Sequence, residues 1–361
     1  MKITIIAGAR PNFMKIAPII HAIQQAQAAG KEINYRLVHT GQHYDKNMSG
    51  SFFEELNIPA PHANLESGGG TQAEQTANIM VRFEQELLEN PTDLVLVVGD
   101  VTSTMACAIV AQKLHTKVAH VEAGIRSNDW SMPEEINRLV TDAITNYFIT
   151  TSEVANQNLR ANGVKNEQIF FVGNTMIDTL LKQRPNFRQP AIWKELHLQE
   201  KNYIVMTLHR PANVDEESKL KDLLNEIINN SHDLPLIFPV HPRTAKHLQD
   251  LGINHPRLHM TEPMSYLEFN YLVERAKAVV TDSGGITEET TVMGVPCMTL
   301  RDNTERPETI TEGTNELIGT NPKAIAPAMQ TLFSGNWKKG KIPALWDGKT
   351  AERIVGALLS L

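Results

Sequence analysis

The sequence predicts an α/β protein made of two doubly wound, parallel-sheet domains that face each other across a cleft. Short apolar runs alternate with longer helical patterns through most of the chain, which is typical of βα units in parallel sheets. The alternation stops near the middle and then restarts, and 361 residues suffice for about two ordinary domains. Polar motifs follow many of the apolar runs, at the strand ends where doubly wound sheets bind ligands.

The first half of the chain, residues 1–175, is expected to form the first domain. Each strand is a short apolar run that could be buried in a parallel sheet. The predicted strands are Lys2–Ala7, Tyr35–Thr40, Leu94–Val98, Val118–Val121, Tyr147–Thr150 and Ile169–Val172. The clearest predicted helices are Phe13–Ala29, Gln72–Glu89 and Ser103–Lys113.

Residues 176–200 break the alternation and are expected to connect the two domains, because a helical start leads into a segment with two prolines. The second domain, residues 201–345, resumes the pattern. Its predicted strands are Tyr203–Leu208, Leu236–Val240, Leu258–Met260, Ala278–Thr281 and Pro296–Leu300. The chain ends in a short amphipathic helix within residues 346–361, which could pack back on the first domain.

The composition excludes several classes of protein. The net charge of −7 leaves no basic excess to neutralise a nucleic-acid backbone, so any phosphate site must be local. The two cysteines, Cys107 and Cys297, lie far apart in apolar contexts and indicate no disulfide framework. No CxxC or HExxH metal pattern, signal peptide or membrane-spanning run is visible, so we expect a cytoplasmic chain.

The segment from Thr281 to Glu289 is the most informative motif. It follows an apolar strand and leads into a helix that ends at Gly294. The Ser283-Gly284-Gly285 turn lets a phosphate approach free backbone N–H groups at the positive end of the helix dipole. Glu288 and Glu289, one turn later, suit a sugar hydroxyl. The motif indicates a nucleotide-diphosphate site, although an ordinary strand-to-helix turn carries the same residues.

Two cations follow the first strand. Gly8-Ala9-Arg10-Pro11 places Arg10 in the turn, and Lys15 lies on the first turns of the next helix. The turn lacks the GxGxxG fingerprint of a dinucleotide site. Paired cations at the carboxyl end of a strand suit a diphosphate, whereas either one alone would be an ordinary surface residue.

Three carboxylates follow predicted strands of the first domain: Asp100, Glu122 and Glu134. Each has a structural alternative. Asp100 could cap a helix, Glu122 could pair with Arg126, and Glu134 could stabilise the first turn of a helix that begins at Pro133. Three acids near one sheet edge nevertheless favour acid/base chemistry, because burial and mutual repulsion separate their pKa values.

Polar residues also follow the predicted strands of the second domain. A histidine lies next to or near an arginine in both His209-Arg210 and His241-Pro242-Arg243. Two such pairs favour a functional role for these histidines over a purely structural one. Their spacing does not match a metal site. Arg306 could complete the neutralisation of a diphosphate. Phe269 lies one helix before the Ser-Gly-Gly turn and is either core or a stacking surface for a base.

Together these motifs resemble the non-hydrolysing UDP-N-acetylglucosamine 2-epimerase family, and the resemblance runs nearly end to end. The resemblance is specific because many motifs match in the same order along the chain. They include Gly8-Ala9-Arg10-Pro11, Thr40-Gly41-Gln42-His43, Gly99-Asp100, His120-Val121-Glu122-Ala123-Gly124, Pro133-Glu134-Glu135, Asn137-Arg138, Leu208-His209-Arg210, Asp282-Ser283-Gly284-Gly285 and Thr304-Glu305-Arg306-Pro307-Glu308. The resemblance implies two Rossmann-like domains of the GT-B type, usually a homodimer, and a reaction without metal or nicotinamide.

The resemblance also implies a mechanism. A base removes the poorly acidic proton of sugar carbon 2 while UDP leaves carbon 1, and the resulting 2-acetamidoglucal is reprotonated on the other face as UDP returns. This interconverts UDP-N-acetylglucosamine and UDP-N-acetylmannosamine, a precursor step for cell-surface polysaccharides. The implied acid/base residues are Asp100, Glu122 and Glu134, with His209 near the leaving phosphate.

The remaining implied residues bind the substrate. Lys15 would help to hold the sugar diphosphate, Glu289 the ribose, and Phe269 the uracil. The full implied substrate-binding set is Arg10, Lys15, Gln42, His43, Arg138, Arg210, His241, Phe269, Ser283, Gly284, Gly285, Glu289 and Arg306.

The sequence departs from well-known bacterial members after Gln42-His43, where Tyr44-Asp45 replaces their arginine. The segment 66–76 is also rich in glycine and lacks arginine. In those members this region belongs to an activating second UDP-sugar site, so activation is not expected here. Tyr44-Asp45 and Asn47-Met48-Ser49 resemble relatives that act on UDP-2,3-diacetamido-glucuronate. That substrate, a hydrolysing 2-epimerase and a GT-B glycosyltransferase are the alternatives, and a regulatory UDP-sugar-binding module is less consistent with three acids.

Overall fold

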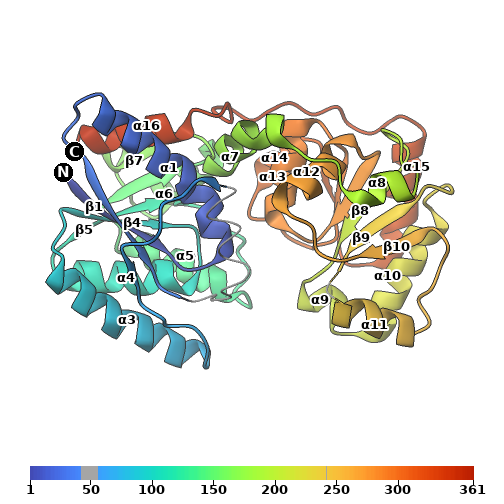
Figure 1. Cartoon of the computed structure of the whole chain (residues 1–361), viewed down its shortest axis with the longest axis horizontal. Coiled ribbons are helices and arrows are strands. Elements are labelled where there is room, and N and C mark those ends of the chain that lie inside the picture. The colour runs from blue at the N-terminus through green and yellow to red at the C-terminus, as the bar shows by residue number, and fades with distance from the viewer. Residues whose placement is uncertain (42–55, 241) are drawn as a thin grey trace. The chain divides into compact units, whose positions relative to one another are not determined.

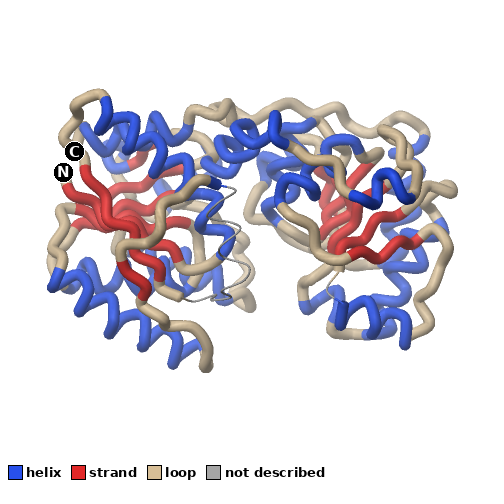
Figure 2. Tube along the Cα trace, viewed as in Figure 1, coloured by secondary structure: helices blue, strands red, loops and turns tan. Residues whose placement is uncertain are grey.

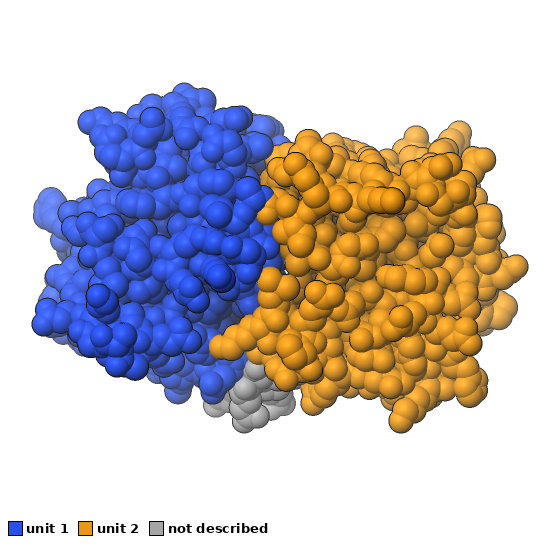
Figure 3. All heavy atoms as spheres, turned by 90° about the horizontal axis from the view of Figure 1, so that it is seen from above, with its two compact units in different colours: residues 1–179, 344–361 blue, residues 180–343 orange. Residues whose placement is uncertain are grey.

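The computed structural model describes residues 1–41, 56–240 and 242–361, with only the backbone at positions 10, 242, 243 and 247. The chain folds into two compact units (Figure 3). Unit 1 comprises Met1–Thr179 and Ala344–Leu361, and unit 2 comprises Leu180–Pro343. Residues 176–200, the predicted connection, are therefore divided between the two units.

Unit 1 is a parallel sheet with helices on both faces (Figures 1 and 2). Its strands are β1 (Lys2–Ala7), β2 (Asn34–His39), β3 (Ala63–Asn64), β4 (Leu94–Val98), β5 (Lys117–Val121), β6 (Tyr147–Thr150) and β7 (Ile169–Phe171). Its helices are α1 (Arg10–Ala28), α3 (Gln72–Glu89), α4 (Thr102–Lys113), α5 (Pro133–Ala143), α6 (Glu153–Ala161), α7 (Thr175–Gln183, which continues into unit 2) and α16 (Thr350–Leu359).

The strand order of unit 1 is β3-β2-β1-β4-β5-β6-β7, and every pairing is parallel. The chain winds outward in one direction from β1 and then in the other from β4, so the sheet reverses between these two strands. Helices α1 and α16 pack together on one face, while α3, α4 and α5 form a layer on the other (Figure 1). Strands covered on both faces are apolar throughout, and all five residues of β4 are buried.

Unit 2 repeats this architecture with fewer strands. Its strands are β8 (Ile204–Thr207), β9 (Leu236–Pro239), β10 (Leu258–Thr261), β11 (Ala278–Thr281), β12 (Cys297–Thr299) and β13 (Asn315–Leu317). Its helices are α8 (Ala191–Glu195), α9 (Pro211–Val214), α10 (Glu217–Asn229), α11 (Pro242–Asp250), α12 (Tyr266–Arg275), α13 (Gly284–Met293), α14 (Pro307–Thr311) and α15 (Ile325–Phe333).

The strand order of unit 2 is β10-β9-β8-β11-β12-β13, and it reverses between β8 and β11. Alternate residues of β8 enter two different cores. Ile204 and Met206 pack with apolar residues of α10 and α15, whereas Val205 packs with Leu272 and Val273 of α12. Both faces of the sheet are therefore covered, as a parallel sheet requires.

These two parallel sheets confirm the predicted fold class. Most predicted strands agree with the structure to within one residue, but the short strands β3 and β13 were not predicted. The start of the first helix was wrong: α1 begins at Arg10, not at Phe13, so Arg10 is the first helical residue and does not lie in the preceding turn. Pro11 explains the earlier start, because its fixed φ suits the first turn of a helix.

The C-terminal segment is held on unit 1 by specific contacts. The indole of Trp346, which is buried, donates to the Thr151 carbonyl. The Asp178 carboxylate accepts the N–H groups of Thr350 and Ala351 and so caps α16. Burial raises the pKa of Asp178 even though these N–H groups oppose the shift. At Gly173 the backbone comes close to Leu345, where an added Cβ would lie 2.1 Å from the carbonyl oxygen.

We therefore expect Gly173→Ala to destabilise unit 1. Gly173 has a φ of +103°, a conformation that costs an L-residue about 1–2 kcal/mol, and the collision with Leu345 adds roughly 1–3 kcal/mol of overpacking. Gly163→Ala is the matched control, because Gly163 has a φ of +83° but no described atom lies within 4 Å of an added Cβ. Urea denaturation of both variants tests this, and equal losses of stability would contradict the close approach at Leu345.

Candidate functional site

Asn12 organises the turn after β1. Its side-chain oxygen accepts the N–H groups of Gly8 and Ala9 at 3.0 and 2.9 Å, and its amide donates to the Val98 carbonyl at the end of β4. Strands β1 and β4 flank the reversal of the sheet, so this one side chain joins the two strand ends at the position where doubly wound sheets bind ligands. Lys15 lies on the same helix, one turn further along.

Lys15 and Glu122 form a buried ion pair at this sheet edge. The ammonium Nζ lies 2.7 Å from Oε2 of the carboxylate, and the two residues are 9% and 3% exposed. Gly99 makes room for the pair, because a Cβ there would lie 3.1 Å from the Lys15 Nζ. A buried carboxylate is costly without a partner, so Lys15 offsets the cost of burying Glu122.

Glu122 also has a strained backbone. Its φ is +72°, in the left-handed region that costs a residue with a side chain about 1–2 kcal/mol. The strain is held by the fold, because the Glu122 N–H donates to the Ile149 carbonyl of the neighbouring strand β6 at 2.9 Å. A charged residue kept both buried and strained at a strand end indicates a functional role.

Asp100, which is partly exposed, is held by a second network around the buried Arg138. The guanidinium of Arg138 donates to Asp100 at 2.6 Å and to Glu135 at 2.9 Å. Glu135 also accepts the N–H groups of Ser127 and Asn128. Burial alone raises the pKa of Glu135, but these N–H groups and Arg138 outweigh burial and hold the pKa below its ordinary value. Arg138, predicted to bind substrate, is thus bonded to two carboxylates of unit 1.

The neighbouring acids Glu134 and Glu135 differ sharply in their surroundings. Glu135 is buried and bonded to the 127–128 turn, whereas Glu134 is exposed on the first turn of α5. Of this pair, Glu134 is the one that a ligand can reach. The prediction chose Glu134 for chemistry, and the structure leaves it available.

In unit 2 the Asp282 carboxylate is the centre of the polar site. Asp282 is fully buried and accepts the N–H groups of His209 and Arg210 and the side-chain amide of Asn213. It also lies 2.8 Å from Nδ1 of the His209 ring. Burial raises the pKa of Asp282, but His209 and the other donors outweigh burial and lower it.

This arrangement orients the His209 ring. A carboxylate at Nδ1 holds the proton on that nitrogen, which leaves Nε2 to accept or donate a proton elsewhere. The side chain of His209 is 61% exposed, so its outer nitrogen is accessible. His209 is therefore an oriented and accessible imidazole that follows β8, bonded to Asp282 just before the Ser-Gly-Gly turn that follows β11.

The Ser283-Gly284-Gly285 turn opens α13. Ser283 is the N-cap, and within the described part of the chain its side chain makes no capping hydrogen bond. A Cβ at Gly284 would lie 2.9 Å from Oε1 of Glu305. Glu305 is itself bonded to Arg301 at 2.6 Å, and although burial raises its pKa, Arg301 lowers it to about 2. The Glu305 carboxylate therefore lies beside Gly284 at the N-terminus of α13, where backbone N–H groups favour an anion.

Two buried glutamates follow on α13. Glu288 pairs with Arg306 at 2.5 Å, and both residues are buried. Glu289 accepts the Tyr266 hydroxyl at 2.8 Å. Burial raises the pKa of Glu289 to about 7, with the Tyr266 hydrogen bond opposing and Glu288 adding to the shift. Phe269, on α12, is half-buried and packs against the core on that face of the sheet.

The sequence was compared with known proteins. A family model described as UDP-N-acetylglucosamine 2-epimerase matches residues 25–359. A UDP-N-acetylglucosamine 2-epimerase of Methanocaldococcus jannaschii is 41% identical over 99% of both chains. A UDP-2,3-diacetamido-2,3-dideoxy-D-glucuronate 2-epimerase of Pseudomonas aeruginosa is 39% identical over 92% of this chain and 92% of its own.

This chain belongs to the UDP-N-acetylglucosamine 2-epimerase family. The crystal structure of the M. jannaschii UDP-GlcNAc 2-epimerase in complex with UDP-GlcNAc and UDP matches with a TM-score of 0.87 and 40% identity, over 100% of both chains. The resemblance inferred from the motifs is thereby confirmed.

Some predicted site residues of this epimerase-family chain cannot be placed. Gln42, His43 and His241 lie outside the described residues, as do Tyr44-Asp45 and Asn47-Met48-Ser49, and the side chain of Arg10 is likewise outside the description. Lys15, Asp100 and Glu122 gather at one edge of the unit 1 sheet. His209, Arg210 and the 283–285 turn gather at the corresponding edge of the unit 2 sheet.

Sequence reasoning missed the residues that hold this family's polar groups in place. Asn12 follows the Gly8-Ala9-Arg10-Pro11 motif, and Asp282 and Glu305 lie inside their motifs, but the sequence indicates no separate role for any of the three. Their signal in the sequence is weak, because Asn12 and Asp282 each bond to a strand end or loop more than 70 residues away. In the part of the chain that the structure describes, no cluster of three or more His, Cys, Asp or Glu could hold a metal, and no helix could span a membrane.

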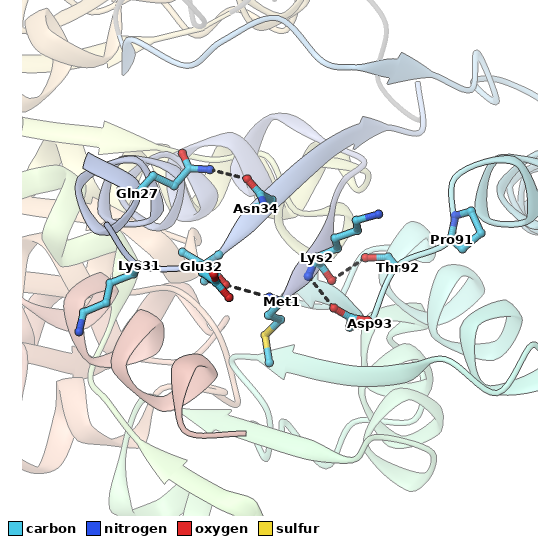
Figure 4. Close-up of a pocket in the computed structure, with 10 residues that line it drawn as sticks. Met1, Lys2, Gln27, Lys31, Glu32, Asn34, Pro91, Thr92 and Asp93 are labelled. Atoms are coloured by element: carbon cyan, nitrogen blue, oxygen red, sulfur yellow. Dashed lines mark hydrogen bonds between the residues drawn. The ribbon is translucent and has the colours of Figure 1, made fainter. Parts of the chain in front are cut away.

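A separate hollow lies at the opposite edge of the unit 1 sheet, where the strands begin (Figure 4). Met1, Lys2, Asn34 and Asp93 line it, and the Lys2 N–H donates to Asp93. None of the predicted site residues lines it.

Glu308 yields a testable prediction about stability in this family member. It is 3% exposed, and its Oε2 has no hydrogen-bond partner among the described residues. Burial raises its pKa to about 7, Arg306 opposes the shift, and Glu288 and Glu312 add to it. The folded state therefore binds the proton more tightly than the unfolded chain, so ionisation destabilises the fold as the pH rises from about 4.5 to 7.

We expect Glu308→Gln to be more stable than the parent chain at about pH 8, by about 1–3 kcal/mol, and similar at about pH 4.5. Urea denaturation at the two pH values measures the difference. Glu195→Gln is the control, because Glu195 is exposed on α8 and its substitution leaves the pH dependence unchanged. A stability gain of equal size at both pH values would show that Glu308 is not protonated on folding.

Proposed function

We propose that this chain reversibly epimerises carbon 2 of UDP-N-acetylglucosamine to give UDP-N-acetylmannosamine. The observation that carries the proposal is the full-length similarity, at 41% identity, to the M. jannaschii UDP-N-acetylglucosamine 2-epimerase. The family model and the solved M. jannaschii complex support the same activity.

The reaction needs a leaving group, because the proton on carbon 2 has no adjacent ring carbonyl to acidify it. We propose that a carboxylate removes this proton while the bond from carbon 1 to UDP breaks, which forms 2-acetamidoglucal. Protonation of carbon 2 from the opposite face and return of UDP to carbon 1 give the epimer. The enzyme must therefore hold UDP and supply two proton carriers.

Unit 1 supplies the proton carriers in this proposal. Glu122 is supported by its pairing with Lys15 at 2.7 Å and by its left-handed backbone. Asp100 is supported by Arg138, which holds its carboxylate at the end of β4. Glu134 is the exposed third acid. When substrate binds, the Lys15 ammonium can move from Glu122 to a phosphate oxygen, which would release Glu122 to act as a base.

Unit 2 supplies most of the groups that would bind UDP. The N-terminus of α13 and Ser283 would bind phosphate oxygens, with Arg210 and Arg306 of unit 2 and Arg10 of unit 1 as cations. His209 would protonate or bond the leaving diphosphate through Nε2, because Asp282 occupies Nδ1. Glu289 would accept the ribose hydroxyls and Phe269 would contact the uracil. We further propose a homodimer as the working unit.

A second substrate has a specific observation in its favour. The P. aeruginosa relative, 39% identical, acts on UDP-2,3-diacetamido-2,3-dideoxy-D-glucuronate by its name. Its sequence identity to this chain is close to that of the M. jannaschii enzyme, which is 41%. The chain could therefore epimerise that sugar in place of UDP-N-acetylglucosamine, and both substrates belong in the assay.

Incubation of the purified chain with each UDP-sugar in heavy water, followed by proton NMR, tests the function. We expect UDP-N-acetylmannosamine with deuterium at carbon 2, together with deuterium entering the starting sugar. Exchange only with the diacetamido-glucuronate would favour the second substrate. Free N-acetylmannosamine would indicate a hydrolysing enzyme, and no change in either sugar would overturn the epimerase proposal.

Glu122→Gln should abolish carbon 2 exchange while UDP still binds. Loss of an acid/base group typically costs about 10²–10⁴-fold in rate, and the UDP grip lies on other residues. NMR exchange rates and calorimetric titration with UDP measure the two effects. Glu153→Gln is the control, because Glu153 is also paired with a cation of unit 1, Arg160, but both side chains are exposed. Retained exchange in Glu122→Gln would exclude Glu122 as a proton carrier.

A further inference from the structure

His120 lies on β5, two residues before Glu122, and is completely buried. Both of its ring nitrogens are bonded to oxygen atoms. Nε2 lies 2.8 Å from the Gly99 carbonyl oxygen, and Nδ1 lies 2.7 Å from Oδ1 of Asp142 on α5. The ring therefore spans from the end of β4 to the end of α5.

The partners determine where the ring protons are. A carbonyl oxygen only accepts, so Nε2 must carry a proton to bond Gly99. Nδ1 must also carry a proton if Asp142 is ionised. The second oxygen of Asp142 accepts the Gly124 N–H at 3.0 Å and an Arg126 N–H at 2.6 Å, and both of these groups favour an ionised carboxylate.

The lowered pKa of Asp142 agrees with an ionised carboxylate at Nδ1 of His120. Burial raises the pKa of Asp142, but the hydrogen bond and charge of His120, together with Arg126, outweigh burial and lower it. The charged groups that face His120 are thus Asp142 directly and Arg126 through Asp142, with the Lys15–Glu122 pair at the same edge.

The His120–Asp142 pair holds the backbone next to both Asp100 and Glu122. The Gly99 carbonyl belongs to the peptide group that joins Gly99 to Asp100, so His120 holds the backbone on one side of Asp100. Asn137 holds the other side, by donating to the Asp100 carbonyl at 2.8 Å. At the opposite end, Asp142 holds the segment Gly124–Arg126, which begins two residues after Glu122.

We propose that His120 is a doubly protonated positioning residue whose ion pair with Asp142 sets the spacing between Asp100 and Glu122. The inference rests on the proposed function in so far as these two carboxylates are the proton carriers. His120 has no nitrogen left for a ligand, in contrast to His209, whose side chain is 61% exposed with one nitrogen held by Asp282. His120 thus acts on the reaction only through the two carboxylates.

The protonation is tested in the parent chain by nitrogen-15 NMR of the histidine rings, which shows for each ring whether one or both nitrogens carry a proton. We expect both ring nitrogens of His120 to carry a proton. In Asp142→Asn the amide can donate to Nδ1, so one proton should be lost and only Nε2–H should remain. A neutral His120 ring in the parent chain would overturn the proposal, whether or not the chain epimerises any sugar.

The positioning role is tested by the kinetics of His120→Gln, which can bond only one of the two ends. We expect kcat to fall by about 10²-fold, the cost of a displacement on the order of 1 Å, with KM and UDP affinity little changed. Thr150→Val is the matched control. Thr150, at the end of the neighbouring strand β6, is equally buried, and its hydroxyl bonds to Asn156 and Phe170 rather than to Asp100 or Glu122.

Thermal unfolding of both variants shows how much stability each loses. A kcat in His120→Gln that falls no further than in Thr150→Val would refute positioning, since the loss would then follow stability alone. If His120→Gln does not fold, the ring NMR of the parent chain and of Asp142→Asn decides the question. Absence of epimerase activity in the parent chain would refute the proposed function and leave the protonation result standing.

Discussion

Buried charge at the carboxyl ends of parallel strands is the constraint on which the rest of this structure depends. A doubly wound sheet ends its strands in a region enclosed by helices and loops, where an ion without a partner is unstable. Glu122, Asp142 and Asp282 are all at most 6% exposed, and each is held by a cation or by several N–H groups. These partners determine which residues can take part in chemistry and which are fully engaged.

Both units contain a buried aspartate that is bonded to a histidine, but the two histidines differ in exposure. In each, a buried aspartate bonds one histidine ring and the backbone of a nearby loop. Asp282 bonds only Nδ1 of His209 and leaves the ring exposed, whereas Asp142 bonds a ring whose other nitrogen is already bonded to Gly99. The same pair of residue types therefore leaves an exposed imidazole in unit 2 and a buried imidazole with both nitrogens hydrogen-bonded in unit 1.

Strain and packing support the same sites. Glu122 keeps a left-handed backbone because β6 holds its N–H, and Gly99 leaves the space that the Lys15–Glu122 pair occupies. Asn12 joins the ends of β1 and β4 across the reversal of the sheet. A sheet that reverses its winding leaves an opening between the two loops at that point, and the polar residues of both units follow the strands on either side of it.

Much of this could be predicted from the sequence, since apolar runs, helical patterns and strand-end motifs are local features. They predicted the α/β class, most strands to within one residue, and the epimerase family through motifs such as Asp282-Ser283-Gly284-Gly285. Local patterns failed for the short strands β3 and β13 and for the start of α1. Glu134 and Glu135 are adjacent in sequence, and only the structure shows that Glu135 is buried while Glu134 is exposed.

The sequence by itself determined which chemical groups stand at the strand ends, because those positions follow from local periodicity. Only the tertiary structure decided how the groups are paired. Lys15 and Glu122 are 107 residues apart, and His209 and Asp282 are brought together from different strands. Arg138, a predicted substrate-binding residue, is bonded to Asp100 and Glu135, and neither pairing is visible in the sequence pattern. Such pairings depend on distances of a few ångströms between strand ends, which arise only when the sheet has formed and its helices have packed.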